Sequence, residues 1–133
     1  MNIAITYVIT LVIFAVIDTV WLGTMADRIY RPLIGPMLAD NFRMAPAVVF
    51  YCMYAAALTL FAVMPGLNAG DWKKALILGG LFGLFAYATY DLTNLATLKS
   101  WSTKLVVIDI TWGVVVSAAS SSLACLLALK LLK

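Results

Sequence analysis

Four long apolar runs separated by short polar breaks are the feature that most limits the fold of this sequence. The runs cover about residues 3–25, 45–64, 73–98 and 105–129, and each is close to the ~20 residues that an α-helix needs to cross a bilayer. Soluble domains carry about a quarter charged residues, whereas this chain is 65% hydrophobic and only 11% charged. We therefore predict an all-α fold, an integral membrane four-helix bundle that forms a single transmembrane domain over residues 1–133.

The connections between these runs carry most of the charge. Segment 27–43 combines Arg28 and Arg31 with apolar residues and is interrupted by proline and glycine, so we predict a stretch that lies in the membrane interface. Pro65 and Gly66 follow the second run directly and are expected to end it. A tight link is predicted over residues 99–104.

Four spans place both termini and the turn over residues 68–74 on one side of the membrane. The nine basic residues then divide four to five between the two sides, so the positive-inside rule leaves the orientation open. The first run carries Asp18 and is longer than the apolar region of a signal peptide, so we expect it to be retained as a span. We expect a multi-pass protein of the bacterial inner (cytoplasmic) membrane.

The absence of two residue types narrows the chemistry. The sequence contains no histidine, and all six of its acidic residues are aspartates. Histidine-ligated haem or zinc and Ser-His-Asp catalysis are thereby excluded, and we predict no cofactor and no metal site. The basic residues lie at the ends of apolar runs, where they suit lipid headgroups rather than nucleic acid. Cys52 and Cys125 lie near opposite ends of their runs, so we expect no disulfide between them.

Three aspartates inside the apolar runs form the most informative pattern. The pattern Val-Ile-Asp-x-x-Trp occurs twice, once as Asp18 with Trp21 and once as Asp109 with Trp112. The third run has a relative of this pattern, in which Asp91 follows Tyr90 and precedes Asn94 by three residues. A spacing of three keeps two side chains on about the same helix face, so we expect each aspartate to have an aromatic or amide companion one turn away.

The depth of these aspartates argues that they meet. Counted from the charged residue that bounds each run, Asp18 lies nine residues in, Asp91 eight and Asp109 five, always from the same membrane side. At 1.5 Å per residue these depths are roughly 8 to 13 Å. An ionised aspartate facing lipid costs at least ~2.5 to 3.5 kcal/mol near the membrane centre, so we expect all three to point inward. We therefore expect the three aspartates to form an acidic chamber, in which their negative charge is neutralised by protonation or by a bound cation.

Three features of the sequence have alternative interpretations. The aspartates could instead bond to threonine, asparagine or tryptophan side chains only to hold the helices in register. Arg28 and Arg31 could pair with the acids or receive an anionic headgroup over the chamber, and ordinary anchoring to lipid explains them equally well. The small residues of Gly79-x-x-x-Gly83 and of segment 117–122 suit packing inside the bundle, and the alternative is a homodimer through one of these faces.

The chain also resembles a known family. Asp-Thr-Val-Trp-Leu-Gly from Asp18, Tyr-Asp-Leu-Thr-Asn-Leu-Ala-Thr from Tyr90 and Asp-Ile-Thr-Trp-Gly from Asp109 together resemble a family of small four-span bacterial membrane proteins catalogued as a domain of unknown function. The resemblance covers nearly the whole chain. It implies a bacterial inner-membrane setting and supplies no catalytic residues.

Three classes of function fit these observations. We expect the chamber to bind or transport a small solute, a cation or an amphipathic ligand, with membrane lipids as the other partners. The alternatives are a lipid-active membrane enzyme that uses the aspartates and an accessory subunit of a larger membrane complex, so whether the protein is an enzyme stays open. The candidate ligand-binding residues are Asp18, Trp21, Tyr90, Asp91, Asn94, Asp109, Trp112, Arg28 and Arg31.

Overall fold

The computed structural model describes residues 2–41 and 43–132, and in these residues it contains helices and no strands. Four helical stretches are long and apolar enough to cross a membrane, which confirms the all-α membrane bundle. Two π-helical turns, Ala26–Tyr30 and Thr59–Val63, and a 3-10 turn, Gly35–Met37, interrupt the first two stretches. The α-helices are α1 (Ile3–Met25), α2 (Arg31–Ile34), α3 (Met44–Leu58), α4 (Met64–Ala69), α5 (Trp72–Thr97) and α6 (Thr103–Leu131).

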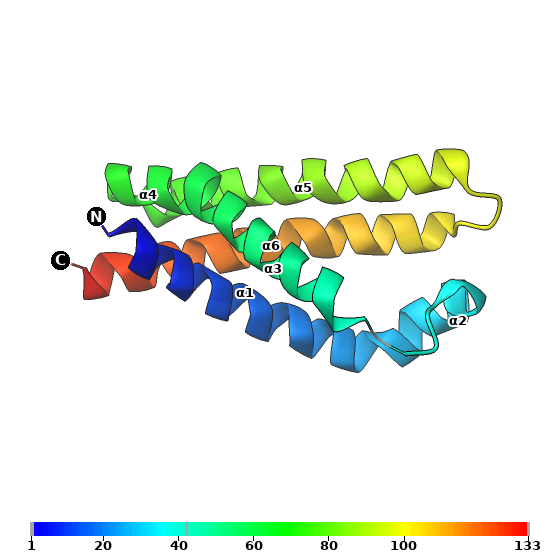
Figure 1. The fold of residues 1–133 in the computed structure, drawn as a ribbon. Helices are drawn as coiled ribbons and strands as arrows, with labels where there is room; N and C mark the ends of the chain where they lie inside the picture. The colour runs from blue at the N-terminus through cyan, green and yellow to red at the C-terminus, as the bar shows by residue number, and fades with distance from the viewer. Residues whose placement is uncertain (1, 42, 133) are drawn as a thin grey trace.

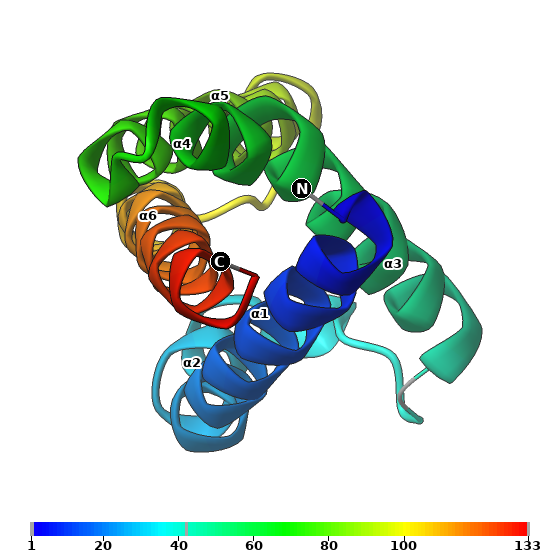
Figure 2. The ribbon, with the colours of Figure 1, turned by 90° about the vertical axis from the view of Figure 1, so that its left-hand side faces the viewer.

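The helices follow the up-and-down order that the apolar runs predict. Both ends of the chain lie at the same end of the bundle as the connection between α4 and α5, whereas α2 and the α5–α6 connection lie at the opposite end (Figure 1). Helices α5 and α6 pack along each other, and α1 packs on α6. Helix α3 packs against α1 on the outer side of the bundle (Figure 2).

Glycines allow α5 and α6 to approach closely. A Cβ atom added to Gly83 would lie 2.2 Å from the carbonyl oxygen of Gly113, and one added to Gly79 would lie 2.7 Å from that of Ser117. Such distances leave no room for any side chain at these two positions. The Gly79-x-x-x-Gly83 motif therefore packs inside the bundle. This is the first of the two alternatives that the sequence allowed for these glycines.

The second span does not stop at Pro65 and Gly66, so that prediction is wrong. The helix widens into the π-helical turn Thr59–Val63 and continues through α4 to Ala69. Proline removes a backbone donor and crowds the preceding turn, and the widened turn directly before Pro65 accommodates both effects. The helix ends instead at Gly70, whose φ of 64° is the left-handed conformation that glycine adopts without strain.

The first span is also longer than predicted. Its helix continues beyond Met25 through the π-helical turn, α2 and the 3-10 turn to Met37, so more than half of segment 27–43 is helical. Asp27 and Arg31 are four residues apart in this extension, and the Arg31 Nε donates to the Asp27 Oδ1 at 2.7 Å. Phe42, within the same predicted segment, lies outside the described residues.

The buried side chains form layers along the bundle. An apolar cluster that includes Val63 and the free Cys125 lies toward the chain termini. A second cluster, Phe14, Tyr54, Leu58 and Val116, occupies the middle. The other cysteine, Cys52, is free as well, which confirms that the two are not bonded to each other. Beyond the middle cluster, toward α2, three buried aspartates lie among apolar residues such as Leu105.

Candidate functional site

Asp18, Asp91 and Asp109 line one cavity of about 260 Å³ at the α2 end of the bundle. Their exposed fractions are 6%, 0% and 9%, so all three face the interior rather than lipid. They come from α1, α5 and α6, the helices whose direction brings the three residues to one depth. We call this cavity the aspartate chamber. Aromatic side chains make up much of the rest of its wall: Trp21, Tyr30, Tyr87, Tyr90, Trp101 and Trp112.

The two Asp-x-x-Trp motifs pair with each other rather than within themselves. Trp112 Nε1 donates to Asp18 Oδ1 at 2.9 Å, across from α6 to α1. Trp21 Nε1 donates to the Tyr30 hydroxyl at 3.0 Å, and this hydroxyl donates to Asp109 Oδ1 at 2.7 Å. The companion of each aspartate is therefore not the tryptophan one turn away on its own helix. Because α1 and α6 run in opposite directions, the aspartate of one motif is level with the tryptophan of the other.

The two indoles hold this crossed arrangement together. The rings of Trp21 and Trp112 stack with centroids 4.2 Å apart and planes 8° apart. Asp18 accepts a second bond from the Tyr51 hydroxyl of α3 at 2.5 Å. Asp18 thus bonds α3 and α6 to α1, which is the register-holding role that the sequence left open for these acids.

Asp91 differs from the other two aspartates. It is fully buried, yet neither of its carboxyl oxygens has a hydrogen-bond partner in the part of the chain that the structure describes. Its expected companion Asn94 is only partly buried and is not part of the chamber wall. The neighbouring Tyr90 does line the chamber, with its ring edge-on to Trp101 at 5.8 Å. Asp91 is therefore the acid with free acceptor capacity.

No basic side chain balances the acids. Among the described residues, neither lysine nor arginine lines the chamber. Arg28 is exposed, and Arg31 pairs with Asp27 and lines a separate surface cavity together with Arg43. The structure therefore does not bring these predicted site residues to the aspartates. The chamber carries three carboxyl groups, and residues 2–41 and 43–132 place no basic side chain in its wall.

Asp91 and Asp109 are close neighbours in the chamber, whereas Asp18 is bonded to Tyr51 and Trp112. Within residues 2–41 and 43–132, no three aspartate or cysteine side chains are close enough together to hold a metal ion. A metal ion needs its oxygen ligands at about 2.0 to 2.6 Å. The described side chains alone therefore do not supply a three-ligand metal set.

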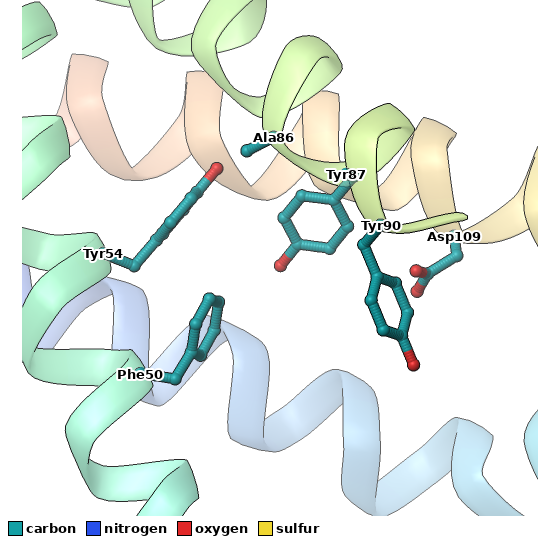
Figure 3. A pocket seen from close by; sticks show the side chains of 6 residues that line it. All are labelled: Phe50, Tyr54, Ala86, Tyr87, Tyr90 and Asp109. Carbon is teal, nitrogen blue, oxygen red and sulfur yellow. The ribbon is translucent and has the colours of Figure 1, made fainter. Parts of the chain in front are cut away.

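A second cavity adjoins the chamber. It measures about 380 Å³ and is lined by Phe50 and Tyr54 of α3, by Ala86, Tyr87 and Tyr90 of α5, and by Asp109 of α6 (Figure 3). We call it the aromatic groove. It shares Tyr87, Tyr90 and Asp109 with the chamber.

Sequence reasoning missed several of these aromatic residues. Tyr30 and Tyr51 supply bonds to aspartates, and Tyr54 and Tyr87 form cavity walls. The signal was present as aromatic residues three or four positions apart, Phe50 with Tyr54 and Tyr87 with Tyr90, which place rings on one helix face. Nothing in this spacing indicates which face turns toward the aspartates.

Comparison with known proteins gives a family and no activity. Residues 3–126 match the family described as "Predicted membrane protein (DUF2177)". Searches of the curated proteins and of the solved structures each returned no match. The family description identifies a membrane protein and assigns no residue a role, so the chemistry rests on the chamber itself.

Proposed function

This chain belongs to the DUF2177 family of predicted membrane proteins, and from that premise we propose that it is a membrane-embedded binding protein for an organic cation. Asp91 and Asp109 hold the cation in the aspartate chamber, and Asp18 positions the surrounding helices. The observation that carries the proposal is Asp91, which is fully buried and accepts no hydrogen bond from any described residue.

A buried polar group without a partner is costly. Leaving one unsatisfied costs about 1 to 3 kcal/mol, and more if it is charged. A cationic ligand offsets this cost because it brings both a positive charge and, for a protonated amine, N–H donors. The three carboxyl groups attract such a ligand, and no basic side chain of the described chain competes with it inside the chamber.

The walls of the chamber suit an organic ammonium group. Tyrosine and tryptophan rings attract cations through their negative faces, by about 0.5 to 2 kcal/mol per contact. The chamber offers such rings from α5, as Tyr87 and Tyr90, and from the α5–α6 connection, as Trp101. Its volume of about 260 Å³ accommodates a small headgroup.

Binding is favoured over transport by the layers of the bundle. The two apolar clusters, represented by Phe14 and Val63, lie between the chamber and the end that carries the chain termini, together with buried hydroxyl side chains. A polar ligand in the chamber would have to cross both clusters to leave on the other side. The chamber therefore supports uptake and release of the ligand at one face of the bundle.

Titration with ethylammonium, followed by tryptophan fluorescence, tests the proposal. Three of the four tryptophans line the chamber, so the signal reports on it directly. We expect saturable binding that weakens roughly tenfold to a hundredfold in Asp91→Asn, which keeps the shape and removes the charge. Asp40→Asn is the matched control because Asp40 is exposed and lies outside the chamber. Unchanged binding in Asp91→Asn, or no saturable signal in the wild type, would contradict the proposal.

The two other functions from the sequence have less support. A lipid-active enzyme would need acids gathered around a phosphate-bound metal ion, whereas these acids lie on separate helices and form no three-ligand metal set in the described chain. A lipid species that changes in a strain lacking this protein would favour the enzyme. For an accessory subunit, purification in mild detergent would yield a stoichiometric partner protein.

For the setting of this binding role, we propose the inner membrane of a bacterium, which the family resemblance supports. A homodimer through an outer helix face is also compatible with the role. Fractionation of cells that produce a tagged chain, together with the mass of the protein in detergent, tests both.

A further inference from the structure

The aspartate chamber and the aromatic groove are neighbouring cavities with part of their wall in common. They share the side chains of Tyr87, Tyr90 and Asp109, so the two cavities adjoin at these three residues. A third cavity, of about 440 Å³, shares Phe50 and Tyr54 with the groove and continues along the outer face of α3. A path therefore leads from the buried acids to the surface that faces lipid.

The path exists because the second span changes neighbours along its length. Helix α3 packs against α1, whereas the π-helical turn Thr59–Val63 and α4 pack against α5. The span therefore diverges from α5 toward α2, and the groove lies where the two separate (Figure 3). Its wall includes Ala86, whose short side chain fills less of the groove than the neighbouring tyrosines do.

The chemistry of the groove changes from one end to the other. At its inner end lies Asp109, which is also part of the chamber. At its outer end lie Phe50, which is 44% exposed, and beyond it Met53, which is 68% exposed, both on the lipid-facing side of α3. An acidic end joined to an apolar channel is complementary to a molecule with a cationic head and an apolar tail.

We infer that the organic cation is a single-chain amphipathic amine whose alkyl chain lies in the aromatic groove and whose head enters the chamber from within the bilayer, between α3 and α5. This inference rests on the proposed function. A neutral lipid leaves the acids without a counter-charge, and the phosphate of a phospholipid is repelled by them. The cationic head of the amphipathic amine matches the acidic end of the path, and its alkyl chain matches the apolar end.

The groove provides room for the alkyl chain while the head is bound, and it adds little affinity of its own. Lipid tails are as apolar as the groove, so moving an alkyl chain from the bilayer into it gains little free energy. A short cation reaches the chamber from water, whereas a long-chain amine is already partitioned into the bilayer and has to slide its chain through the groove. Obstruction of the groove should therefore distinguish the two ligands.

The test compares ethylammonium with dodecylammonium in phosphatidylcholine nanodiscs, again by tryptophan fluorescence. Ala86→Phe fills the groove from α5, and Phe50→Trp narrows it from α3 at a half-exposed position that tolerates a larger ring. We expect each variant to bind dodecylammonium at least roughly tenfold more weakly and ethylammonium within about twofold of wild type. Ala96→Phe, on an exposed face of α5 outside the groove, should bind both as wild type does.

The possible outcomes distinguish the lateral path from the proposed binding of an organic cation. If the wild type binds ethylammonium but not dodecylammonium, or if the groove variants bind dodecylammonium as well as wild type, the lateral path is refuted and the cation site stands. Equal weakening of both ligands in both groove variants also refutes the path. Absence of ethylammonium binding in the wild type refutes the proposed function itself.

Discussion

Alanine substitution at Gly83 tests how closely the fold of this protein and its site are connected. Gly83 faces α6 at the closest approach of the two long helices. Tyr87 and Asp91 follow it at intervals of four residues, on the same face of α5. Any displacement of α5 at Gly83 is therefore passed directly to a wall of the groove and to the unpartnered acid of the chamber.

The expected magnitude follows from the distances. The new Cβ would lie 2.2 Å from the Gly113 carbonyl oxygen, and ordinary contact begins at 3.4 Å, so the backbones must separate by about 1.2 Å. Overpacking of this kind costs about 1 to 3 kcal/mol, whereas replacing a helical glycine by alanine gains about 0.5 to 1 kcal/mol. We expect Gly83→Ala to lower the free energy of unfolding by about 1 to 2 kcal/mol.

Gly80→Ala is the matched control. On the same helix, its Cβ would meet the Ala118 Cβ at 3.5 Å and the Val114 Cγ1 at 3.8 Å, both ordinary contacts. This variant should match or slightly exceed the wild type in stability. Unfolding by sodium dodecyl sulfate in mixed micelles, followed by circular dichroism, measures both free energies, and ethylammonium titration should show weaker binding in Gly83→Ala alone. Equal stability of the two variants would refute the close packing that this reasoning assumes.

Three further substitutions probe the bonds around the chamber and the far end of the bundle. Trp112→Phe keeps an aromatic ring against Trp21 but removes the N–H donor to Asp18, and we expect a loss of about 1 to 2 kcal/mol in the same unfolding assay. Tyr30→Phe removes the hydroxyl that donates to Asp109 and should cost about 1 to 3 kcal/mol while shifting the carboxyl bands in infrared difference spectra. Unshifted bands would argue against the bond. Gly70→Ala forces a side chain into a φ of 64° and should cost about 1 to 2 kcal/mol without changing ethylammonium affinity, since the turn lies at the opposite end from the chamber.

The sequence by itself determined the number of spans and the depth of the acids. Both are quantities measured along a helix axis, where rise per residue and hydrocarbon thickness are fixed. The up-and-down order then places Asp18, Asp91 and Asp109 at one level, and the cost of a carboxylate in lipid turns them inward. The glycine spacing on α5 likewise indicated a close helix contact before any partner was known.

The tertiary structure decided what each acid contacts. The rotation of a helix about its axis and the choice of neighbour depend on packing between distant segments, and no local spacing encodes them. Thus Trp112 reaches Asp18 rather than its own Asp109, and Tyr30 arrives from a π-helical turn that the sequence pattern did not predict. The same packing leaves Asp91 alone among the acids without a partner in the described chain. Along the chain, then, distance is fixed by covalent geometry, but contact across the bundle is set by the mutual fit of all four spans.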